Sequence, residues 1–344
     1  MNSRKLLLLI LGLLLVIGSV LGYSFYNKIY KPNTVEEGYL YIPTNSDFKE
    51  VENLIRPFLK HVKPFAWVAK KLNYSDAIKP GKYKISEGMS NLELVRMLRS
   101  GRQATVNLSF NNQDTFEKLA GRISEQIEAD SFSLFKSFTE GAFLNKAGFN
   151  SANAIGMYIP NSYEFYWNTN AEKFRAKMLN EYNKFWSSER IEKAKKINLT
   201  KNEVITLASI VQKETASVSE RPIVAKLYLN RLASGWPLQA DPTIIFAIKA
   251  KLGNDMVIKR VFSKDLEIDS PYNTYKNPGL PPGPISMPDI SSIEAVLNPS
   301  SHDYYYMCAS VTSFGTHEFA KTLDQHNRNA AKYRLWINKQ GVNR

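Results

Sequence analysis

The sequence has very little cysteine and histidine. Cys308 is its one cysteine, so the chain cannot form an internal disulfide or a cysteine-rich zinc or iron–sulfur site. It falls in an apolar and aromatic stretch that predicts an inert core strand. Four histidines leave little material for a metal centre, and there is no glycine-rich phosphate loop, GxSxG elbow or HExxH motif. We therefore expect neither a metal nor a cofactor.

Acidic residues are scarce relative to basic ones. The 344-residue chain holds 45 lysines and arginines against 32 acids, a formal net charge of +13. A basic protein suits an anionic surface such as cell wall or phospholipid headgroups. We expect no nucleic-acid partner, because the sequence has no lysine–arginine cluster and no nucleic-acid-binding motif. With 44% hydrophobic and 12% aromatic residues, the chain should fold around a buried core.

Charge is absent from one long segment near the N-terminus. Residues 6–26 are uncharged and mostly apolar, and 21 helical residues span about 30 Å, the thickness of the bilayer's hydrocarbon core. The sequence near the end of this segment, Val20-Leu21-Gly22-Tyr23, is a poor cleavage site for signal peptidase. We predict an uncleaved single-span anchor within residues 1–31, with a cytoplasmic N-terminus and the remainder exported.

Residues 32–105 have the pattern of a small α+β module. Alternating apolar residues predict strands at 38–43 and 83–85, and helical spacing predicts a helix over 47–60. A Ser-Asn-Leu-Glu capping box predicts a further helix over 90–101, which ends near a glycine. The module should therefore have its own small core.

Residues 106–344 predict a larger, mixed α+β domain. Its first part, 111–200, is mainly helical in pattern but is interrupted at 158–167, where five aromatics surround a Pro-Asn turn. Such a cluster is either a corner of the core, the commoner outcome for aromatic residues, or a platform on which sugar rings stack. Tyr163 is the residue of this segment that we predict to contact a substrate.

One helix carries the best candidate for acid–base chemistry. A Thr-Lys-Asn-Glu capping box at 200–203 opens it, and apolar residues at i, i+3, i+4 and i+7 from Val204 predict one buried face. Glu214 lies on the flank of that face. Apolar surroundings raise the pKa of a carboxyl, as a proton donor near neutral pH requires. Spacing alone favours the commoner outcome, a salt bridge from Glu214 to Arg221 or Arg231.

Polar and aromatic segments follow that helix. A second helix is predicted over 220–233, capped by Ser219 and stopped by Gly235. Rigid loops at 237–243 and 272–285 are rich in proline, asparagine and tyrosine and could line a groove, although each alone is more often a packed loop. We predict that the following residues bind substrate: Asn230, Gln239, Asp241, Tyr272, Asn273 and Tyr275.

Several motifs in one order resemble those of the MltG/YceG-like endolytic murein transglycosylases. The resemblance covers nearly the whole chain and implies an α+β fold with an anchor at 1–31, a LysM-like module at 32–105 and a catalytic domain at 106–344. The motifs are LASIVQKET at 207–215, LNRL at 229–232, LQADPT at 238–243, YNTY at 272–275, GLPPG at 279–283, and FAKTL at 319–323 with His326-Asn327.

The resemblance also implies a reaction and a catalytic acid. The family's ASIVEKE-type helix often has glutamate at two places, which here are Gln212 and Glu214. An amide cannot donate a proton as a carboxylic acid does, so the role falls on Glu214. The implied reaction cleaves the β-1,4 bond between N-acetylmuramic acid and N-acetylglucosamine within nascent strands, ends elongation and leaves 1,6-anhydro ends. We expect Asp241 to orient a sugar or the loop.

Other functions stay open on the sequence alone. The chain could be a non-catalytic, wall-binding scaffold that uses the LysM-like module, although retention of Glu214 with its motif loops favours the enzyme. It could also be a muramidase, which needs a second carboxylate placed with water. For either enzyme the expected partners are peptidoglycan strands and the cell membrane, and the resemblance adds penicillin-binding proteins of the wall-synthesis machinery.

Overall fold

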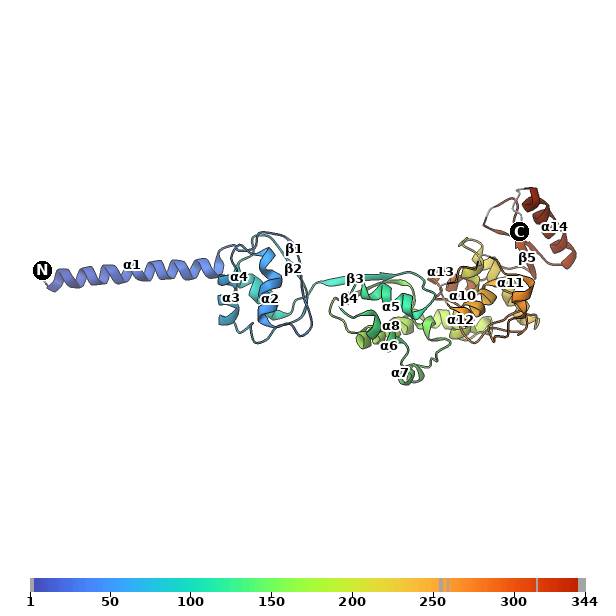
Figure 1. Cartoon of the computed structure of the whole chain (residues 1–344), viewed down its shortest axis with the longest axis horizontal. Coiled ribbons are helices and arrows are strands. Elements are labelled where there is room, and N and C mark those ends of the chain that lie inside the picture. The colour runs from blue at the N-terminus through green and yellow to red at the C-terminus, as the bar shows by residue number, and fades with distance from the viewer. Residues whose placement is uncertain (1–2, 254–255, 259, 314, 340–344) are drawn as a thin grey trace. The chain divides into compact units, whose positions relative to one another are not determined.

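The computed structural model describes residues 3–253, 256–258, 260–313 and 315–339. By their internal contacts these residues divide into two compact units. The N-terminal unit comprises Met1–Leu108 with Gln126–Ala129 and Tyr163–Asn170, and the C-terminal unit comprises the remainder. The chain therefore mixes helices and strands, as expected (Figure 1).

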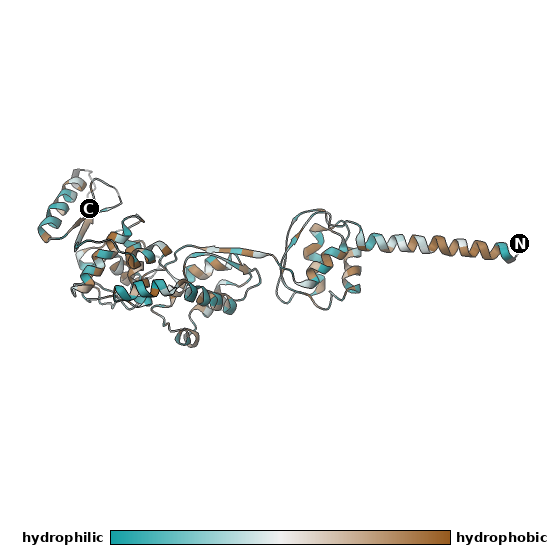
Figure 2. Ribbon diagram, turned by 180° about the vertical axis from the view of Figure 1, so that it is seen from behind, coloured by the Kyte–Doolittle hydropathy of each residue, from teal (hydrophilic) through white to brown (hydrophobic). Residues whose placement is uncertain are grey.

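Helix α1, Ser3–Tyr30, begins the N-terminal unit. It is long and apolar enough to cross a membrane, and most of its ribbon has the brown colour of hydrophobic residues (Figure 2). Its leucines are exposed. Its 28 residues extend about 42 Å. The end of α1 docks on the rest of the unit, because the Asn91 side chain donates to the Lys28 carbonyl at 2.8 Å and Phe25 lies 5.5 Å from Trp67.

The rest of the N-terminal unit is a two-stranded antiparallel sheet with helices. Strand β1, Gly38–Ile42, pairs with β2, Gly81–Ile85, so that Leu40 lies opposite Tyr83. The helices are α2 (Phe48–Ile55), η1 (Arg56–Phe58), α3 (Val62–Lys71) and α4 (Asn91–Ser100). Their apolar faces enclose a core that includes Ile42, Val51, Phe65, Tyr83 and Leu94.

Local signals account for the ends of these helices. Ser90 and Glu93 form the expected capping box of α4, and Gly101 follows the helix with a φ of 72°. The helix expected over 47–60 is shorter, since α2 ends at Ile55 and a 3-10 turn contains Pro57. Proline has no amide hydrogen to donate and its ring clashes with the preceding turn, so the α-helix cannot continue through it.

Strand β3 (Thr105–Phe110) pairs with β4 (Asn161–Tyr166), and most of both strands belongs to the N-terminal unit. The C-terminal unit is mainly helical, and in it β5 (Tyr306–Ala309) pairs with β6 (His317–Ala320). The helices before the candidate site are α5 (Phe116–Ser124), α6 (Ser131–Phe138), α7 (Gly141–Lys146), η2 (Ala154–Met157), α8 (Ala171–Phe185) and α9 (Ser188–Lys196). Those that follow are α10 (Lys201–Glu214), α11 (Arg221–Ala233), α12 (Asp241–Leu252), η3 (Ser263–Glu267), α13 (Ile290–Leu297) and α14 (Leu323–Lys339).

Helix α10 is the central helix of this unit. It packs on α11, α12 and α13, and every residue from Val204 to Val211 is buried (Figure 1). The expectation of a single buried face was therefore too narrow. A polar residue on another face finds its hydrogen-bond partners within the protein. Ser209 donates to the Thr206 carbonyl at 2.7 Å and accepts from the Ile285 amide at 3.0 Å. The expected capping box of Thr200 and Glu203 is confirmed.

Two local predictions in this unit were wrong. The N-cap residue of α11 is Glu220, not Ser219. The Glu220 side chain does not cap the helix, because its carboxylate is hydrogen-bonded to His317. Ser219 instead lies 3.1 Å from the hydroxyl of Ser217. Cys308 does lie in a strand, β5, but this strand belongs to a two-stranded sheet and the cysteine is only half-buried, so it is not in a core strand.

Candidate active site

Glu214 is the last residue of α10, where the helix leaves the core. Its side chain is partly buried and accepts a hydrogen bond from the Tyr228 hydroxyl of α11, with 3.1 Å between Oη and Oε2. Burial raises the pKa of Glu214 to about 7. The neighbouring Asp241 carboxylate raises this pKa as well, whereas His317, Tyr228 and Arg231 lower it. The carboxyl is therefore half-protonated near neutral pH.

The arginines that spacing allowed as salt-bridge partners are held elsewhere. Arg221 pairs with Asp289 at 2.9 Å. Arg231 donates to the carbonyls of Tyr305 and Leu238, and burial lowers the pKa of its guanidinium. Among the residues that the structure describes, Glu214 forms no ion pair within 4 Å. Its carboxyl is thus available for proton transfer.

The two polar loops meet at the start of α12. The Tyr275 hydroxyl donates to Asp241, and burial together with this carboxylate raises the pKa of Tyr275 far above its usual range. The Thr274 hydroxyl accepts from the Ala240 amide at 3.0 Å, so the loops at 238–243 and 272–275 form one rigid structure. Asp241 is exposed and close enough to Glu214 for their charges to interact.

The other predicted binding residues differ in what they can contact. Gln239 is exposed, with a φ of 50°. Tyr272 is half-buried, and its ring is tilted against that of Phe246, with 4.5 Å between the centroids. Asn273 is fully buried and its amide donates to two backbone carbonyls, so any effect on a substrate passes through the loop. Asn230 donates to the carbonyls of His302 and Tyr304, which fixes the segment before β5.

Tyr163 is not part of this cluster. It lies in β4 and belongs to the N-terminal unit, whereas Glu214 and its neighbours belong to the C-terminal unit. Its neighbours in sequence divide between the two outcomes expected of the aromatic segment, because Tyr158 is fully buried and Tyr166 is exposed. A sugar-stacking role for Tyr163 stays a prediction.

Gln212, the amide in the motif of α10, has a structural role. Its Oε1 accepts from the Asp289 amide at 2.5 Å and from the Ser292 hydroxyl at 3.2 Å. Asp289 in turn caps α13 by accepting from the Ser292 amide. Gln212 therefore joins α10 to the start of α13, and Glu214 two residues later faces other partners.

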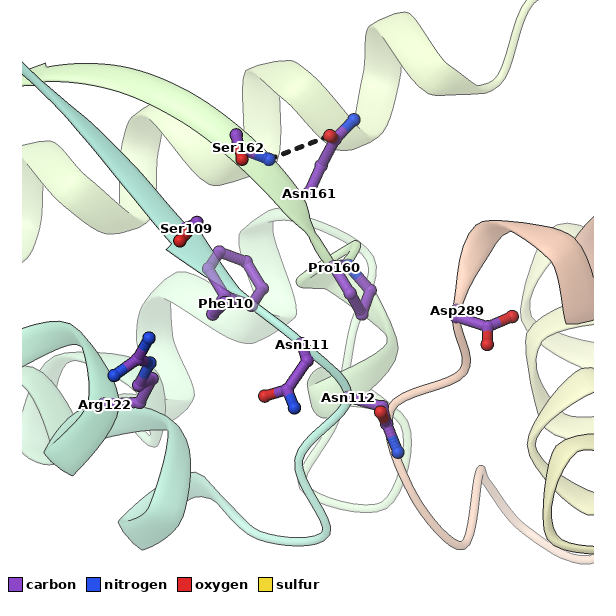
Figure 3. Close-up of a pocket in the computed structure, with 9 residues that line it drawn as sticks. All are labelled: Ser109, Phe110, Asn111, Asn112, Arg122, Pro160, Asn161, Ser162 and Asp289. Carbon is purple, nitrogen blue, oxygen red and sulfur yellow. Dashed lines mark hydrogen bonds between the residues drawn. The ribbon is translucent and has the colours of Figure 1, made fainter. Parts of the chain in front are cut away.

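A polar hollow of about 740 Å³ lies beside the start of α13 (Figure 3). Side chains of Asn111, Asn112 and Arg122 line one side, and Asn161 and Asp289 reach it from other segments (Figure 3). The hollow is large enough for a ligand, but neither Glu214 nor the residues around it line the cavity. In the described part of the chain, no three histidine, cysteine or acidic residues are grouped so that they could hold a metal ion.

Three residues near Glu214 were not among the predicted site residues. Tyr228 and Arg231 lie on the predicted second helix, where Arg231 was expected only as a possible salt-bridge partner of Glu214. His317 is held by Glu220, whose Oε1 accepts from its amide at 2.6 Å and whose Oε2 lies 3.0 Å from its Nδ1. Its position just before the FAKTL motif was the one sequence signal that could have found it.

The site thus holds a partly buried carboxyl whose pKa is about 7, beside two polar loops that are bonded to each other. The sequence profile of the YceG-like family matches residues 40–332. The chain therefore belongs to the YceG-like family.

Named relatives agree with this assignment. The chain is 30% identical over 356 residues to an endolytic murein transglycosylase of Streptococcus pneumoniae, a match that covers 93% of this chain and 63% of that protein. It is 29% identical to an endolytic murein transglycosylase of Bacillus subtilis, over 85% of this chain and 83% of the relative. A crystal structure of a YceG-like protein from Listeria monocytogenes has a TM-score of 0.57 and 28% identity, and the match covers 85% of this chain and 98% of that one.

Proposed function

We propose that this protein is a membrane-anchored endolytic murein transglycosylase, with Glu214 as its catalytic acid. The observation that carries the proposal is a partly buried carboxyl whose pKa is raised to about 7, placed beside Asp241 and free of any ion pair among the described residues. The names of the relatives from S. pneumoniae and B. subtilis support the same activity.

The proposed reaction needs one group that first donates and then accepts a proton. Protonated Glu214 gives its proton to the glycosidic oxygen of N-acetylglucosamine as the bond from C1 of N-acetylmuramic acid breaks. The carboxylate then takes the proton of the muramyl C6 hydroxyl while that oxygen bonds to C1. This gives a 1,6-anhydro end, consumes no water and returns Glu214 to its starting state. A pKa near 7 suits both steps.

The neighbours of Glu214 have supporting roles in this proposal. Tyr228 holds the carboxyl by its hydrogen bond, and Asp241, itself held by Tyr275, orients a sugar in the groove. Gln239 and Tyr272 are accessible enough to contact the strand on either side. Asn273 and Asn230 keep the surrounding loops in place.

The N-terminal parts fit an enzyme that works at the membrane surface. We propose that α1 spans the cell membrane with its N-terminus in the cytoplasm, so that the catalytic unit is exported. Residues 32–105 are proposed as a LysM-like module. The strand–helix–helix–strand order of β1, α2, α3 and β2 supports this, and α4 follows β2. Penicillin-binding proteins are the proposed partners, and co-purification with the full chain would test them.

Product analysis tests the function directly. Purified protein is incubated with isolated glycan strands, and the new ends are identified by mass spectrometry. We expect 1,6-anhydro-muramic acid ends, located within strands rather than only at their tips. Reducing muramic acid ends would mean hydrolysis and would make Asp241 the second carboxylate to test. No cleavage under any condition would favour the non-catalytic scaffold.

A further inference from the structure

A small basic pocket lies next to the candidate active site in the C-terminal unit. Its volume is about 140 Å³, and its polar lining consists of Asp114, Thr115, Lys118, Lys213 and Lys249. Pro242, Ile245, Phe246 and Ile285 form its apolar part. A pocket this small cannot enclose a sugar ring with its substituents but has room for one charged group with a short apolar side.

The pocket carries surplus positive charge. Asp114 is its one acidic lining residue, and Lys213 bonds to it at 2.7 Å while Lys118 stands 3.9 Å away. These lysines, with Lys249 nearby, lower the pKa of Asp114 even though burial opposes this, so Asp114 is ionised. Within the described residues Lys249 forms no ion pair. Three ammonium groups against one carboxylate leave about two positive charges for an anionic ligand.

One wall of the pocket adjoins a polar loop of the candidate active site. Phe246, on the apolar wall, contacts Tyr272 of that loop, with the ring centroids 4.5 Å apart. Lys213 and Pro242 also line the pocket and are next to Glu214 and Asp241 in the chain. A strand that contacts Tyr272 therefore passes the edge of the pocket.

We propose that this pocket binds a carboxylate of the peptide attached to the muramyl residue at the cleavage site. The proposal rests on the proposed function. While the peptides are attached, the lactyl carboxyl of each muramyl residue is in an amide bond, so the sugars are uncharged and the carboxylates of the strand belong to the peptides. The lysines would pair with the carboxylate, while Ile245 and Ile285 would contact its methyl or methylene groups. The enzyme would then recognise strands that still carry their peptides.

Binding measurements on the full chain in detergent test this proposal without cleavage. The Glu214→Gln variant is titrated with a disaccharide tetrapeptide and with the same molecule after its peptide carboxylates have been amidated. We expect the ligand with free carboxylates to bind about tenfold tighter at low salt, and the difference to shrink as salt screens the charges. Equal affinities for the two ligands would overturn the proposal.

Lysine variants locate the binding. The Lys118→Gln/Lys249→Gln double change, made in the Glu214→Gln protein, should remove most of the tenfold difference. Lys184→Gln, on α8 and paired with Glu181, is the matched control and should preserve it. The assignment would be overturned if Lys184→Gln removed the tenfold difference in affinity while the double change preserved it. It would also be overturned if inorganic phosphate competed for the pocket as strongly as the peptide ligand. Anhydro ends formed from peptide-free strands would support the proposed function separately.

Discussion

The Tyr228 hydroxyl donates a hydrogen bond to Glu214 Oε2 at 3.1 Å and so joins α11 to the end of α10. Tyr228 is fully buried, and this burial raises the pKa of its phenol well above the usual value, so it stays a donor at all ordinary pH values. The bond fixes one oxygen of the carboxyl, and among the described residues the other oxygen accepts no hydrogen bond. A proton donor held in this way loses little entropy on reaching its reacting geometry.

Replacing the proposed acid should abolish cleavage but not folding. Glu214→Gln keeps the shape of the side chain and can still accept from Tyr228, but it cannot donate a proton as an acid. We expect kcat to fall by about 10²–10⁴-fold with an unchanged circular dichroism spectrum. Gln212→Ala is the control on the same helix. It leaves the Asp289 amide without its partner and should lower stability by about 1–2 kcal/mol while activity persists. Full activity of Glu214→Gln would contradict the assignment.

The pH dependence of cleavage should report the pKa of Glu214. Because the protonated form is the donor, kcat/KM should fall about tenfold per pH unit above pH 7. Asp241 raises this pKa, so Asp241→Asn should move the alkaline limb to lower pH. Tyr228 lowers it, so Tyr228→Phe should move the limb to higher pH. Shifts of both variants in the same direction would mean that another group controls the limb.

The same raised pKa predicts a cost in stability. The carboxyl has a pKa of about 7 in the folded protein against about 4.5 unfolded, so the folded state binds more protons between these values. Stability should therefore decrease as pH rises from 4.5 to 7, and the cost should be complete above 7. Glu214→Gln removes it and should be more stable than the parent at pH 8 by about 2–3 kcal/mol, with little difference at pH 4. Equal melting temperatures at pH 8 would contradict a buried, costly carboxylate.

What the sequence could predict was decided by local interactions. The capping boxes at 90–93 and 200–203 require only residues three positions apart, and both are present. The cap of α11 was predicted wrongly because the Glu220 carboxylate is hydrogen-bonded to His317, 97 residues further along the chain. Nothing near residue 220 in the sequence reveals that partner.

The candidate site shows the same limit. Helical spacing was enough to place Glu214 at the edge of an apolar face. It could not reveal that Arg221 pairs with Asp289, or that Arg231 is held by backbone carbonyls, and so could not decide between an ion pair and a free acid. The partners that tune Glu214 come from α11, α12 and β6, which only the tertiary fold brings together.

The N-terminal helix should keep the protein in the membrane. Residues 6–26 of helix α1 carry no charge, and the end of the helix packs on the rest of the N-terminal unit through Lys28 and Phe25. We expect the protein to fractionate with membranes, to resist extraction by salt and to retain its N-terminal residues in mass spectrometry. A mature chain that starts near residues 20–26 would show that the segment is a cleaved signal.

The module at 32–105 should help to hold glycan without taking part in the chemistry. It has a core of its own, in which Ile42, Phe65 and Tyr83 are fully buried, so the purified fragment should fold. A tethered module raises the local concentration of substrate at the active site. Its removal should therefore raise KM for long strands by roughly tenfold and change kcat little.

Co-sedimentation with sacculi distinguishes a glycan-binding role of the module from a purely supporting role. The fragment 32–105 should pellet with sacculi, whereas a fragment unfolded by Tyr83→Ala, which leaves a large cavity in the core, should not. If the folded fragment stays in the supernatant and the truncated enzyme keeps its affinity for long strands, the module only supports the catalytic unit. A fall in kcat with unchanged KM would lead to the same conclusion, because loss of support disturbs the active site rather than the capture of the strand.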